Sequence, residues 1–304
     1  MMDKKEALAF KLDPSLAIHI DELKIIFNEN TQDEVLVLNP LTISFPKNQI
    51  YFIVGDSGTG KTTLINHFNG LLKSKHGNIF IEDNKIIGKK FLISKFKKLR
   101  KSVGMVFQFP EYQLFKDTVL KDVIFGPINL GVKKNRANEL AQKYLQLLGI
   151  PTNLFNRSPF NLSGGQKRRV AIAGILAIEP NIVVFDEPTA GLDPVGIEET
   201  LKIISDLKNE GKTVFVITHE MDIVLRLADK VMVLGNCGIL KFDTPYNVFL
   251  DEDVMKKTSL KKPKIISLID KLVERDIKFK KLYEMKPRTV DQLAQCINEV
   301  KNKK

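Results

Sequence analysis

The sequence predicts an α/β fold built around a mainly parallel β-sheet. Short apolar segments bounded by turn residues recur along the chain, and several are apolar at every position, which is typical of strands buried on both faces of a sheet. Segments with the periodicity of amphipathic helices lie between them. Strands that alternate with helices in this way are typical of α/β domains.

The expected elements can be placed by residue number. We expect strands at residues 17–27, 37–45, 49–55, 78–83, 102–108, 181–188, 213–219 and 230–236. We expect helices at residues 61–72, 139–150 and 196–212, the last of which stops at Gly211, because glycine commonly follows the last turn of a helix.

Two parts of the chain depart from this alternation. Residues 109–160 are rich in Lys, Asn and Leu and have a largely helical pattern. They predict an inserted helical subdomain at about residues 109–180, within a main domain at residues 17–245. After about Thr244 the strand–helix pattern fades, and the tail predicts the helices of a small C-terminal extension at residues 246–304.

Composition and charge limit the class of protein. The 304 residues are 43% apolar and 27% charged, which is typical of a globular chain. The net charge of +11 is uneven: residues 251–304 carry 15 Lys and Arg against 9 Asp and Glu, and residues 85–101 carry eight cations and no carboxylate. Such clusters suit nucleic acid or anionic lipid headgroups, and a solvated face is an equal alternative.

Cysteine usage and hydropathy add further limits. Cys237 and Cys296 lie far apart, which predicts neither a disulfide scaffold nor a zinc site. The N-terminal stretch MMDKKEALAFKLDPS lacks the apolar region of a secretory signal. No apolar run approaches the roughly 18–20 residues needed to span a bilayer, so we expect any membrane role to come through a partner.

The stretch GDSGTGKTT has the spacing of a phosphate-binding loop, G-x-x-x-x-G-K-[ST], and lies between an expected strand and an expected helix. Its glycines let the backbone wrap an anion with N–H groups, Lys61 can reach the terminal phosphates of a nucleotide, and the Thr62 hydroxyl can ligate Mg²⁺. The candidate residues are Gly55, Asp56, Ser57, Gly58, Thr59, Gly60, Lys61, Thr62 and Thr63.

Polar residues end several expected strands. Asp186 and Glu187 follow the apolar run 182–185 at the carboxyl end of one expected strand, where Asp186 can hold Mg²⁺ and Glu187 can orient or deprotonate an attacking water. Gln108 and His219 end two other expected strands, within reach of a γ-phosphate, its Mg²⁺ or the water. Each residue alone is an ordinary strand terminus, but their order and spacing favour one nucleotide site.

The stretch NLSGGQKRR, residues 161–169, predicts a second anion-binding element. A hydroxyl, two glycines and an amide precede three cations and an apolar run that predicts a helix. A helix start offers unpaired N–H groups and the positive end of the helix dipole. The chain therefore has a second such element about a hundred residues after the first.

The order of these motifs resembles the ATP-binding subunit of ABC transporters. The resemblance covers residues 17–245 and rests on the phosphate loop, Gln108, LSGGQ at 162–166, FDEP at 185–188, GLD at 191–193, and His219. VGMVFQFPEYQLF, followed by DVIFGPINLG and a C-terminal extension, is similar to the ATPases of energy-coupling factor importers, which take up vitamins and transition-metal ions. FPEYQLF more closely resembles the second of that family's two paired ATPases.

The resemblance implies a P-loop NTPase fold with an antiparallel N-terminal β portion, with ATP as substrate and Mg²⁺ as cofactor. The Gly55–Thr62 loop and Lys61 would hold the β- and γ-phosphates, and the Mg²⁺ ligands would be Thr62, Gln108 and Asp186. Glu187 would be the general base, and His219 would contact the γ-phosphate. The family stacks adenine on an aromatic ring, for which Phe27 is the best match because it keeps the ring face; an ordinary core Phe is the alternative.

The resemblance also implies partners. Two subunits would meet head to tail, so that the signature residues of one chain close over ATP held by the other. These residues are Ser163, Gly164, Gly165 and Gln166. Asp193 would communicate across the interface. The implied partners are a related ATPase, a transmembrane coupling subunit that docks beside Gln108, and separate substrate-binding membrane proteins. The implied location is peripheral, at the cytoplasmic face of the cell membrane. We expect the basic cluster 85–101 to contact the coupling subunit or lipid headgroups.

Other classes remain open. A soluble ABC ATPase of DNA repair or chromosome organisation would suit the charge of +11. Those proteins insert long coiled coils between phosphate loop and signature, whereas Lys61 and Ser163 lie only 102 residues apart without sustained heptads. A single phosphate loop disfavours a translation factor with tandem ATPase domains. An exporter or another importer class is disfavoured more weakly.

Overall fold

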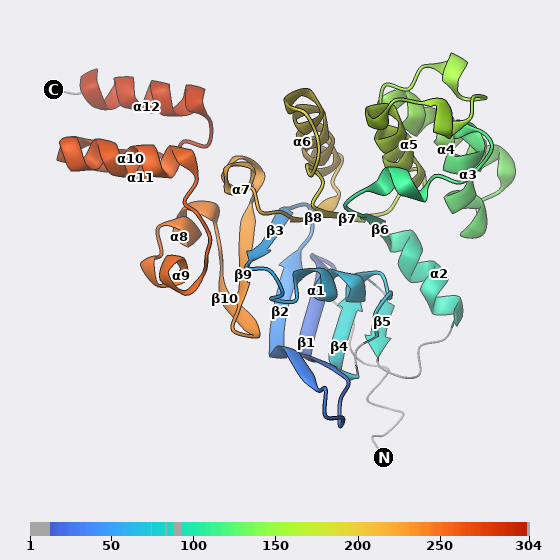
Figure 1. Cartoon of the computed structure of the whole chain (residues 1–304), viewed down its shortest axis with the longest axis horizontal. Coiled ribbons are helices and arrows are strands. Elements are labelled where there is room, and N and C mark those ends of the chain that lie inside the picture. The colour runs from blue at the N-terminus through green and yellow to red at the C-terminus, as the bar shows by residue number, and fades with distance from the viewer. Residues whose placement is uncertain (1–12, 74, 83, 88–92, 303–304) are drawn as a thin grey trace.

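The larger sheet of the molecule is parallel except at one edge. The computed structural model describes residues 13–73, 75–82, 84–87 and 93–302. The strand order is β10-β9-β3-β8-β7-β6, and only β10 runs antiparallel to its neighbour among these described strands. The bounds are β3 Ile50–Gly55, β6 Val103–Val106, β7 Ile182–Asp186, β8 Thr213–Ile217, β9 Lys230–Gly235 and β10 Gly238–Asp243. The prediction of a mainly parallel sheet is confirmed (Figure 1).

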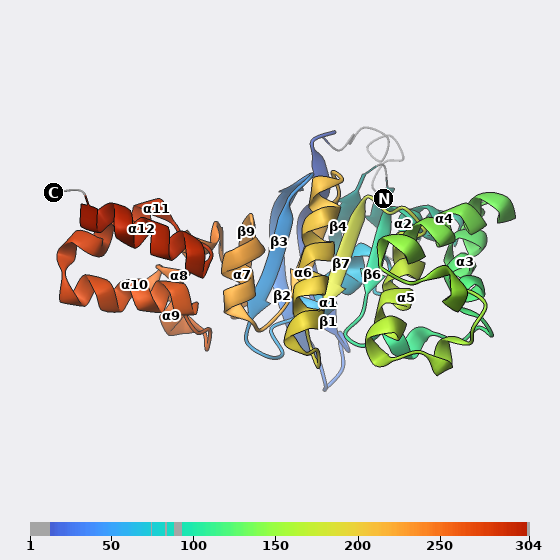
Figure 2. The ribbon, with the colours of Figure 1, turned by 90° about the horizontal axis from the view of Figure 1, so that it is seen from above.

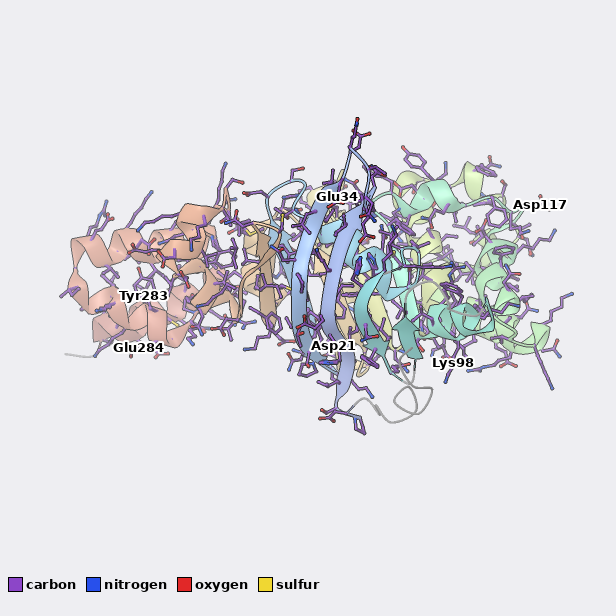
Figure 3. All side chains as sticks on the ribbon, turned by 90° about the horizontal axis from the view of Figure 1, so that it is seen from below. Asp21, Glu34, Lys98, Asp117, Tyr283 and Glu284 are labelled. Carbon is purple, nitrogen blue, oxygen red and sulfur yellow. The ribbon has the colours of Figure 1, made fainter. Side chains whose placement is uncertain are left out.

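A second, antiparallel sheet is built from N-terminal strands in the order β2-β1-β4-β5. The bounds are β1 Leu16–Phe27, β2 Val35–Pro46, β4 His76–Ile81 and β5 Asn84–Ile87. This sheet covers the underside of the molecule, where Asp21 and Glu34 lie near opposite ends of it (Figure 3). It is the antiparallel N-terminal portion that the family resemblance implies.

The larger sheet separates two hydrophobic cores. Side chains of β3 alternate between them: Tyr51 and Ile53 face the core that the two sheets share, whereas Phe52 and Val54 face the helices on the other side. This alternation explains why the strand is apolar at every position. Helix α1, Lys61–Phe68, buries Leu64, Ile65 and Phe68 in the core between the sheets.

Helix α1 is shorter than the sequence predicts. The expectation of a helix over 61–72 is wrong in its last turn, because the helix ends at Phe68 and Gly70 has a φ of +72°. Leu71, expected on the apolar face, is 47% exposed. A residue with positive φ cannot continue a right-handed helix, so the chain turns away there.

Two helical groups lie at opposite ends of the long axis (Figure 2). One end holds α2 Ile93–Ser102, α3 Val119–Asn129, α4 Lys134–Leu147 and α5 Gly164–Leu176, with α6 Pro194–Asn209 and α7 Met221–Leu227 nearer the centre. The other end holds α8 Pro245–Phe249, α9 Glu252–Lys257, α10 Lys264–Arg275, α11 Leu282–Met285 and α12 Val290–Asn302. The expected C-terminal helices are therefore present. They have a small core of their own, made by Ile269, Phe279, Leu282, Leu293 and Val300.

The basic cluster 85–101 lies partly on α2. Lys97, Lys98, Arg100 and Lys101 are exposed on this helix, and Figure 3 labels Lys98. Lys89 and Lys90, like N-terminal residues 1–12, lie outside the described residues. Among the helices that the structure describes, none combines the length and apolar character needed to cross a membrane.

Candidate functional site

The phosphate loop depends on glycines where it leaves β3. Gly55 has a φ of +145°, and a Cβ atom there would lie 2.2 Å from the carbonyl oxygen of Leu234 on the neighbouring strand β9. Gly60, with a φ of +89°, precedes the first turn of α1. Only glycine combines this backbone with so close an approach, so the sheet and the helix together fix the shape of the loop.

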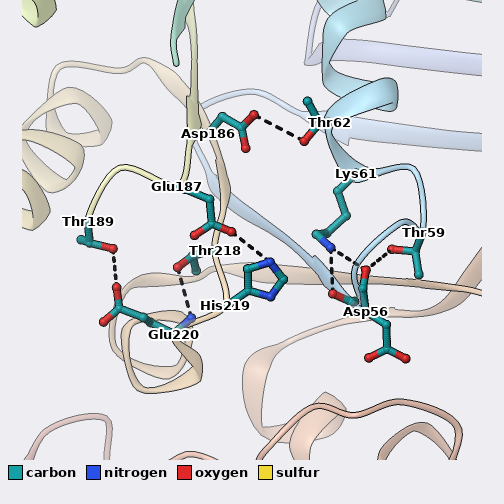
Figure 4. Close-up of polar contacts among 11 residues, drawn as sticks. Asp56, Thr59, Lys61, Thr62, Asp186, Glu187, Thr189, Thr218, His219 and Glu220 are labelled. Atoms are coloured by element: carbon teal, nitrogen blue, oxygen red, sulfur yellow. Dashed lines mark hydrogen bonds and ion pairs between the residues drawn. The ribbon is translucent and has the colours of Figure 1, made fainter. Parts of the chain in front are cut away.

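Lys61 is held at the centre of this loop. Its side chain is buried, and Nζ donates hydrogen bonds to the carbonyl oxygens of Gly55 at 2.8 Å and Asp56 at 2.7 Å (Figure 4). Thr59 Oγ1 donates to the same Asp56 oxygen at 2.9 Å. Burial lowers the pKa of Lys61, and the nearby carboxylates of Glu187, Asp56 and Asp186 oppose that change. The loop thus orients a cation inward, where an anion would meet it.

A group of oxygen atoms lies beside Lys61. Thr62 Oγ1 donates to Asp186 Oδ2 at 3.4 Å, and Gln108 lines the same cleft. Burial raises the pKa of Asp186, while the Thr62 hydrogen bond and the charges of Lys61 and His219 lower it. A hydroxyl, an amide and a carboxylate are ligands that Mg²⁺ accepts. These three residues therefore fit the expected metal.

Glu187 has both an unusual backbone and an unusual carboxyl group. Its φ is +49°, and its N–H donates to the Ile217 carbonyl on β8 at 3.0 Å. Burial, with a smaller contribution from Asp186, raises the pKa of Glu187 to about 7. His219 Nε2 lies 3.2 Å from Glu187 Oε1 (Figure 4). A carboxyl group with a pKa near neutrality suits proton abstraction from water.

Gln108 and His219 lie slightly beyond their expected places. The sequence puts them at the last positions of two strands, and this is wrong by two residues, because β6 ends at Val106 and β8 at Ile217. Both side chains nevertheless reach the cleft. The carboxyl ends of β3, β6, β7 and β8 meet at one edge of the sheet, as parallel strands must.

One cleft gathers most of the expected site residues. Phe27, at the end of β1, lines it and is 40% exposed, so it is not an ordinary core residue. Gly55, Asp56 and Thr59 shape the loop through the Gly55 and Asp56 carbonyls and the Thr59 hydroxyl, and they do not line the cleft. The expected site residues that do line it are Phe27, Ser57, Gly58, Gly60, Lys61, Thr62, Thr63, Gln108, Asp186, Glu187 and His219.

The signature stretch lies apart from this cleft. Within the described residues that line the cleft, none belongs to Leu162–Gln166. Ser163 caps α5 by accepting from the Gln166 N–H at 3.3 Å, while the Gln166 side chain accepts from the Ser163 N–H at 3.1 Å. Ser163, Gly164 and Gly165 are exposed. Asp193 caps α6 by accepting from Gly196 N–H at 2.8 Å, also outside the cleft.

Two cations of NLSGGQKRR have partners within the chain. Arg168 is buried and donates to backbone carbonyls of Gln108, Pro188 and Ala190. Arg169 pairs with Glu199 of α6 at 2.6 Å. The expectation that the whole stretch serves an anion is therefore too broad, because these two guanidinium groups bind other parts of the fold.

Sequence reasoning missed Arg168 and Glu220. Glu220 follows His219, and its carboxylate accepts a hydrogen bond from Thr189 Oγ1, two residues after Glu187 (Figure 4). The run of three cations marks Arg168 as basic but gives no sign of its backbone acceptors. Glu220 belongs to none of the motifs that the sequence contains. Both residues support the segment that follows the general base expected from the sequence.

The fold and the cleft define a P-loop ATPase of the ABC class. The family model described as ABC transporter matches residues 38–190. CbiO1 of Clostridium perfringens, described as part of the ABC transporter complex cbiONQ, superposes with a TM-score of 0.68 at 34% identity over 84% of this chain and 99% of that one. A dimeric ATP-binding cassette, MJ0796, in a post-hydrolysis state with ADP and phosphate, superposes with a TM-score of 0.66 at 25% identity over 75% of this chain and 98% of that one.

Curated relatives narrow the class. The energy-coupling factor transporter ATP-binding protein EcfA2 of Mycoplasma pneumoniae is 51% identical over 92% of this chain and 93% of its own length. The protein of the same description from Mycoplasma genitalium is 50% identical over 95% and 94%. The chain belongs to the family of energy-coupling factor transporter ATP-binding proteins, and it is an ATPase of that type of ABC transporter.

Proposed function

We propose that this chain binds and hydrolyses ATP in its cleft and uses the energy to drive uptake of a vitamin or a transition-metal ion through a membrane partner. The observation that carries the proposal is the convergence of Lys61, Asp186 and Glu187 on one cleft. Different strands supply the phosphate loop and the two acids. This arrangement supports nucleotide hydrolysis more specifically than any one of the motifs.

Each residue has a proposed task in ATP binding. The Gly55–Thr63 loop and Lys61 hold the β- and γ-phosphates through N–H groups and charge. Phe27 offers its exposed ring face to adenine. Thr62, Gln108 and Asp186 hold Mg²⁺, which supplies charge neutralisation at the phosphates. Their oxygen-rich side chains, gathered in one cleft, support this assignment.

Hydrolysis needs a base and a group near the leaving phosphate. Glu187 accepts a proton from the attacking water, because its pKa near 7 lets it be ionised and still basic at neutral pH. His219, 3.2 Å from the Glu187 carboxylate, orients that carboxylate and contacts the γ-phosphate. Water attack at phosphorus breaks the bond to the ADP oxygen and leaves ADP and phosphate.

The signature stretch serves a second ATPase subunit. Ser163, Gly164 and Gly165 are exposed at a helix N-terminus outside the chain's own cleft, so they are free to meet ATP held by a partner. Gln166 keeps Ser163 in the capping conformation, and Asp193 lies beyond the cleft at the start of α6. Head-to-tail pairing with a related ATPase puts each signature over the other subunit's nucleotide. The dimeric cassette among the structural neighbours supports such pairing.

An exposed aromatic surface beside Gln108 supports a membrane partner. Phe109, Tyr112, Phe115 and Phe125 are all exposed, and the Lys116 ammonium lies 4.7 Å from the ring centroids of both Phe115 and Phe125. Exposed aromatic clusters are typical of protein interfaces. We place the transmembrane coupling subunit here, which puts the chain at the cytoplasmic face of the membrane beside separate substrate-binding proteins.

Purification from detergent-solubilised membranes tests this function. A tagged chain should bring down a polytopic membrane protein and a second ATPase, and the complex should hydrolyse ATP in a Mg²⁺-dependent way. Recovery of DNA or ribosomes in place of a membrane protein would instead favour a soluble ABC ATPase.

A further inference from the structure

Arg168 of α5 connects its helix to two segments of the nucleotide site that are far apart in sequence, at Gln108 and at residues 188–190. Its Nη2 donates to the carbonyl oxygens of Pro188 at 2.6 Å and Gln108 at 3.3 Å. Its Nη1 donates to the Ala190 carbonyl oxygen at 3.2 Å. The side chain is 5% exposed, so these bonds are shielded from water. A planar guanidinium group is suited to bonding several carbonyls at once.

We infer that Arg168 is a positioning residue that couples the closure of α5 on the partner's nucleotide to the arrangement of Gln108 and Glu187 in this chain's own cleft. The inference rests on the proposed function, in which Ser163 at the start of α5 contacts ATP held by the partner. Arg168 lies five residues after Ser163, about 7.5 Å along the helix axis. A shift of the helix start therefore moves Arg168 with it.

The segment that Arg168 holds carries a strained residue. Glu187 has a φ of +49°, a conformation that a residue with a side chain keeps only where its surroundings fix it. The carbonyl that follows Glu187 belongs to Pro188 and accepts the shorter Arg168 bond. The Ala190 N–H donates to the Glu187 carbonyl at 3.2 Å and closes a turn, and Ala190 in turn accepts from Arg168.

A second contact also holds this turn, to the loop after β8. Thr189 Oγ1 bonds to Glu220, which follows His219 on the loop after β8. Glu187 is therefore held between the signature helix and the His219 loop. Because Arg168 also binds the Gln108 carbonyl, one guanidinium group links the backbone of a residue expected to hold the metal to Pro188, which directly follows the residue expected to be the base.

Steady-state hydrolysis by the assembled transporter tests the role. In Arg168→Met we expect kcat to fall roughly ten- to hundredfold, because small misplacements of catalytic groups have effects of that size. KM for ATP should stay within about threefold of wild type, since no Arg168 bond reaches the phosphate loop. The kcat of Arg168→Lys should lie between those of wild type and Arg168→Met, because an ammonium group cannot bridge all of these carbonyls.

Arg226→Met is the matched control. Arg226 makes two bonds to Glu198, at 2.6 and 2.7 Å, on the surface between α6 and α7, so this variant also loses a guanidinium group with a tight partner. Its kcat should match wild type. If kcat of Arg168→Met equals that of Arg226→Met, the inference is wrong. If Arg168→Met does not assemble, the test is made with Arg168→Lys. A kcat of Arg168→Lys equal to that of wild type would then overturn the inference.

A double-variant cycle tests the coupling itself. The partner's own base is replaced by Gln, so that turnover reports only this chain's cleft. If Arg168 transmits the effect of Ser163, then Ser163→Arg and Arg168→Met together should lose less than the product of the two single losses. If the loss in the double variant equals the product of the two single losses, the two residues are not coupled and the inference is wrong. A wild-type complex that hydrolyses ATP without driving uptake would count against the proposed function and leave this comparison intact.

Discussion

Glu187 shows how one residue can trade stability for chemistry. Its backbone lies in the left-handed region, which costs on the order of 1–3 kcal/mol for a residue with a side chain. Its carboxylate is largely buried next to Asp186, and the resulting pKa of about 7 means that the folded protein holds the ionised form at a cost. The apo protein is therefore less stable than it would be with a neutral side chain at this position.

Replacing Glu187 by Gln separates the role of the carboxylate in hydrolysis from its cost to the stability of the folded protein. Turnover should be nearly abolished while ATP still binds, because the variant lacks only the base. Raising the pKa from 4.5 to about 7 costs the folded state up to about 3 kcal/mol above pH 7, so the apo variant should melt about 2–5 °C higher at pH 8. The gain should vanish below pH 4.5, where Glu187 is protonated in both states. Thermal unfolding with EDTA measures this, and equal melting temperatures at pH 8 would contradict it.

Phe27 is the residue whose role depends most on its exposed ring. Phe27→Ala should raise KM for ATP about tenfold or more, because stacking of a base on an aromatic ring contributes roughly 1–3 kcal/mol. Phe27→Tyr keeps the ring face and serves as the control with KM near wild type. kcat should change little in either variant, since the proposed contact of the ring is with adenine and not with the reacting phosphate. An alanine variant with wild-type KM would show that adenine binds elsewhere.

Among the elements, α5 gives the clearest prediction about pairing. Ser163→Arg puts a long side chain on the exposed helix start, where it would obstruct a nucleotide held by another subunit. The isolated chain should keep wild-type ATP affinity, since Ser163 does not line its own cleft. ATP-dependent pairing with the second ATPase, followed by light scattering of the mixed subunits, should be lost. If ATP affinity of the isolated chain collapsed instead, head-to-tail pairing would be wrong.

The sequence predicts the elements of this fold better than their contacts. Apolar runs locate the buried strands, because burial on both faces leaves a direct mark on composition. The edge strand β10 was missed, since its residues are only half-buried and its pattern is weak. The strand ends predicted at Gln108 and His219 lie two residues too far along the chain, because the sequence pattern does not mark where the ladder of hydrogen bonds stops.

The motifs predict which residues meet in the cleft but not what holds them. Lys61, Asp186 and Glu187 were found by spacing, since each follows a strand of a parallel sheet. Arg168 could not be assigned this way. Its acceptors are backbone carbonyls at residues 108, 188 and 190, and a carbonyl is the same at every position of a sequence.

On the scale of the whole molecule, the C-terminal extension is joined to the nucleotide-binding body at several points. Ser259 donates its backbone N–H to Asp56 of the phosphate loop at 2.9 Å, and its hydroxyl bonds to the same carboxylate oxygen. Arg288 donates to the Ala228 carbonyl at 2.8 Å. Within the extension, Tyr246 of α8 packs in the main core and is 2% exposed, and its hydroxyl donates to the Pro287 carbonyl at 2.6 Å, which ties the segment before α12 to that core.

The bond from Tyr246 is the most deeply buried of these contacts, and it tests how the segment that leads into α12 is held on the main core. Tyr246→Phe removes only the hydroxyl and leaves the Pro287 carbonyl without its donor, which should cost about 1–3 kcal/mol. Hydrogen exchange in α12, Val290–Asn302, should become faster, because Pro287 leads into that helix. Tyr112→Phe, at an exposed hydroxyl, is the matched control and should leave exchange unchanged. ATP affinity of the isolated Tyr246→Phe chain should stay at the wild-type value, since the link lies away from the cleft. Unchanged exchange in α12 would mean that the remaining contacts hold this helix in place without the bond.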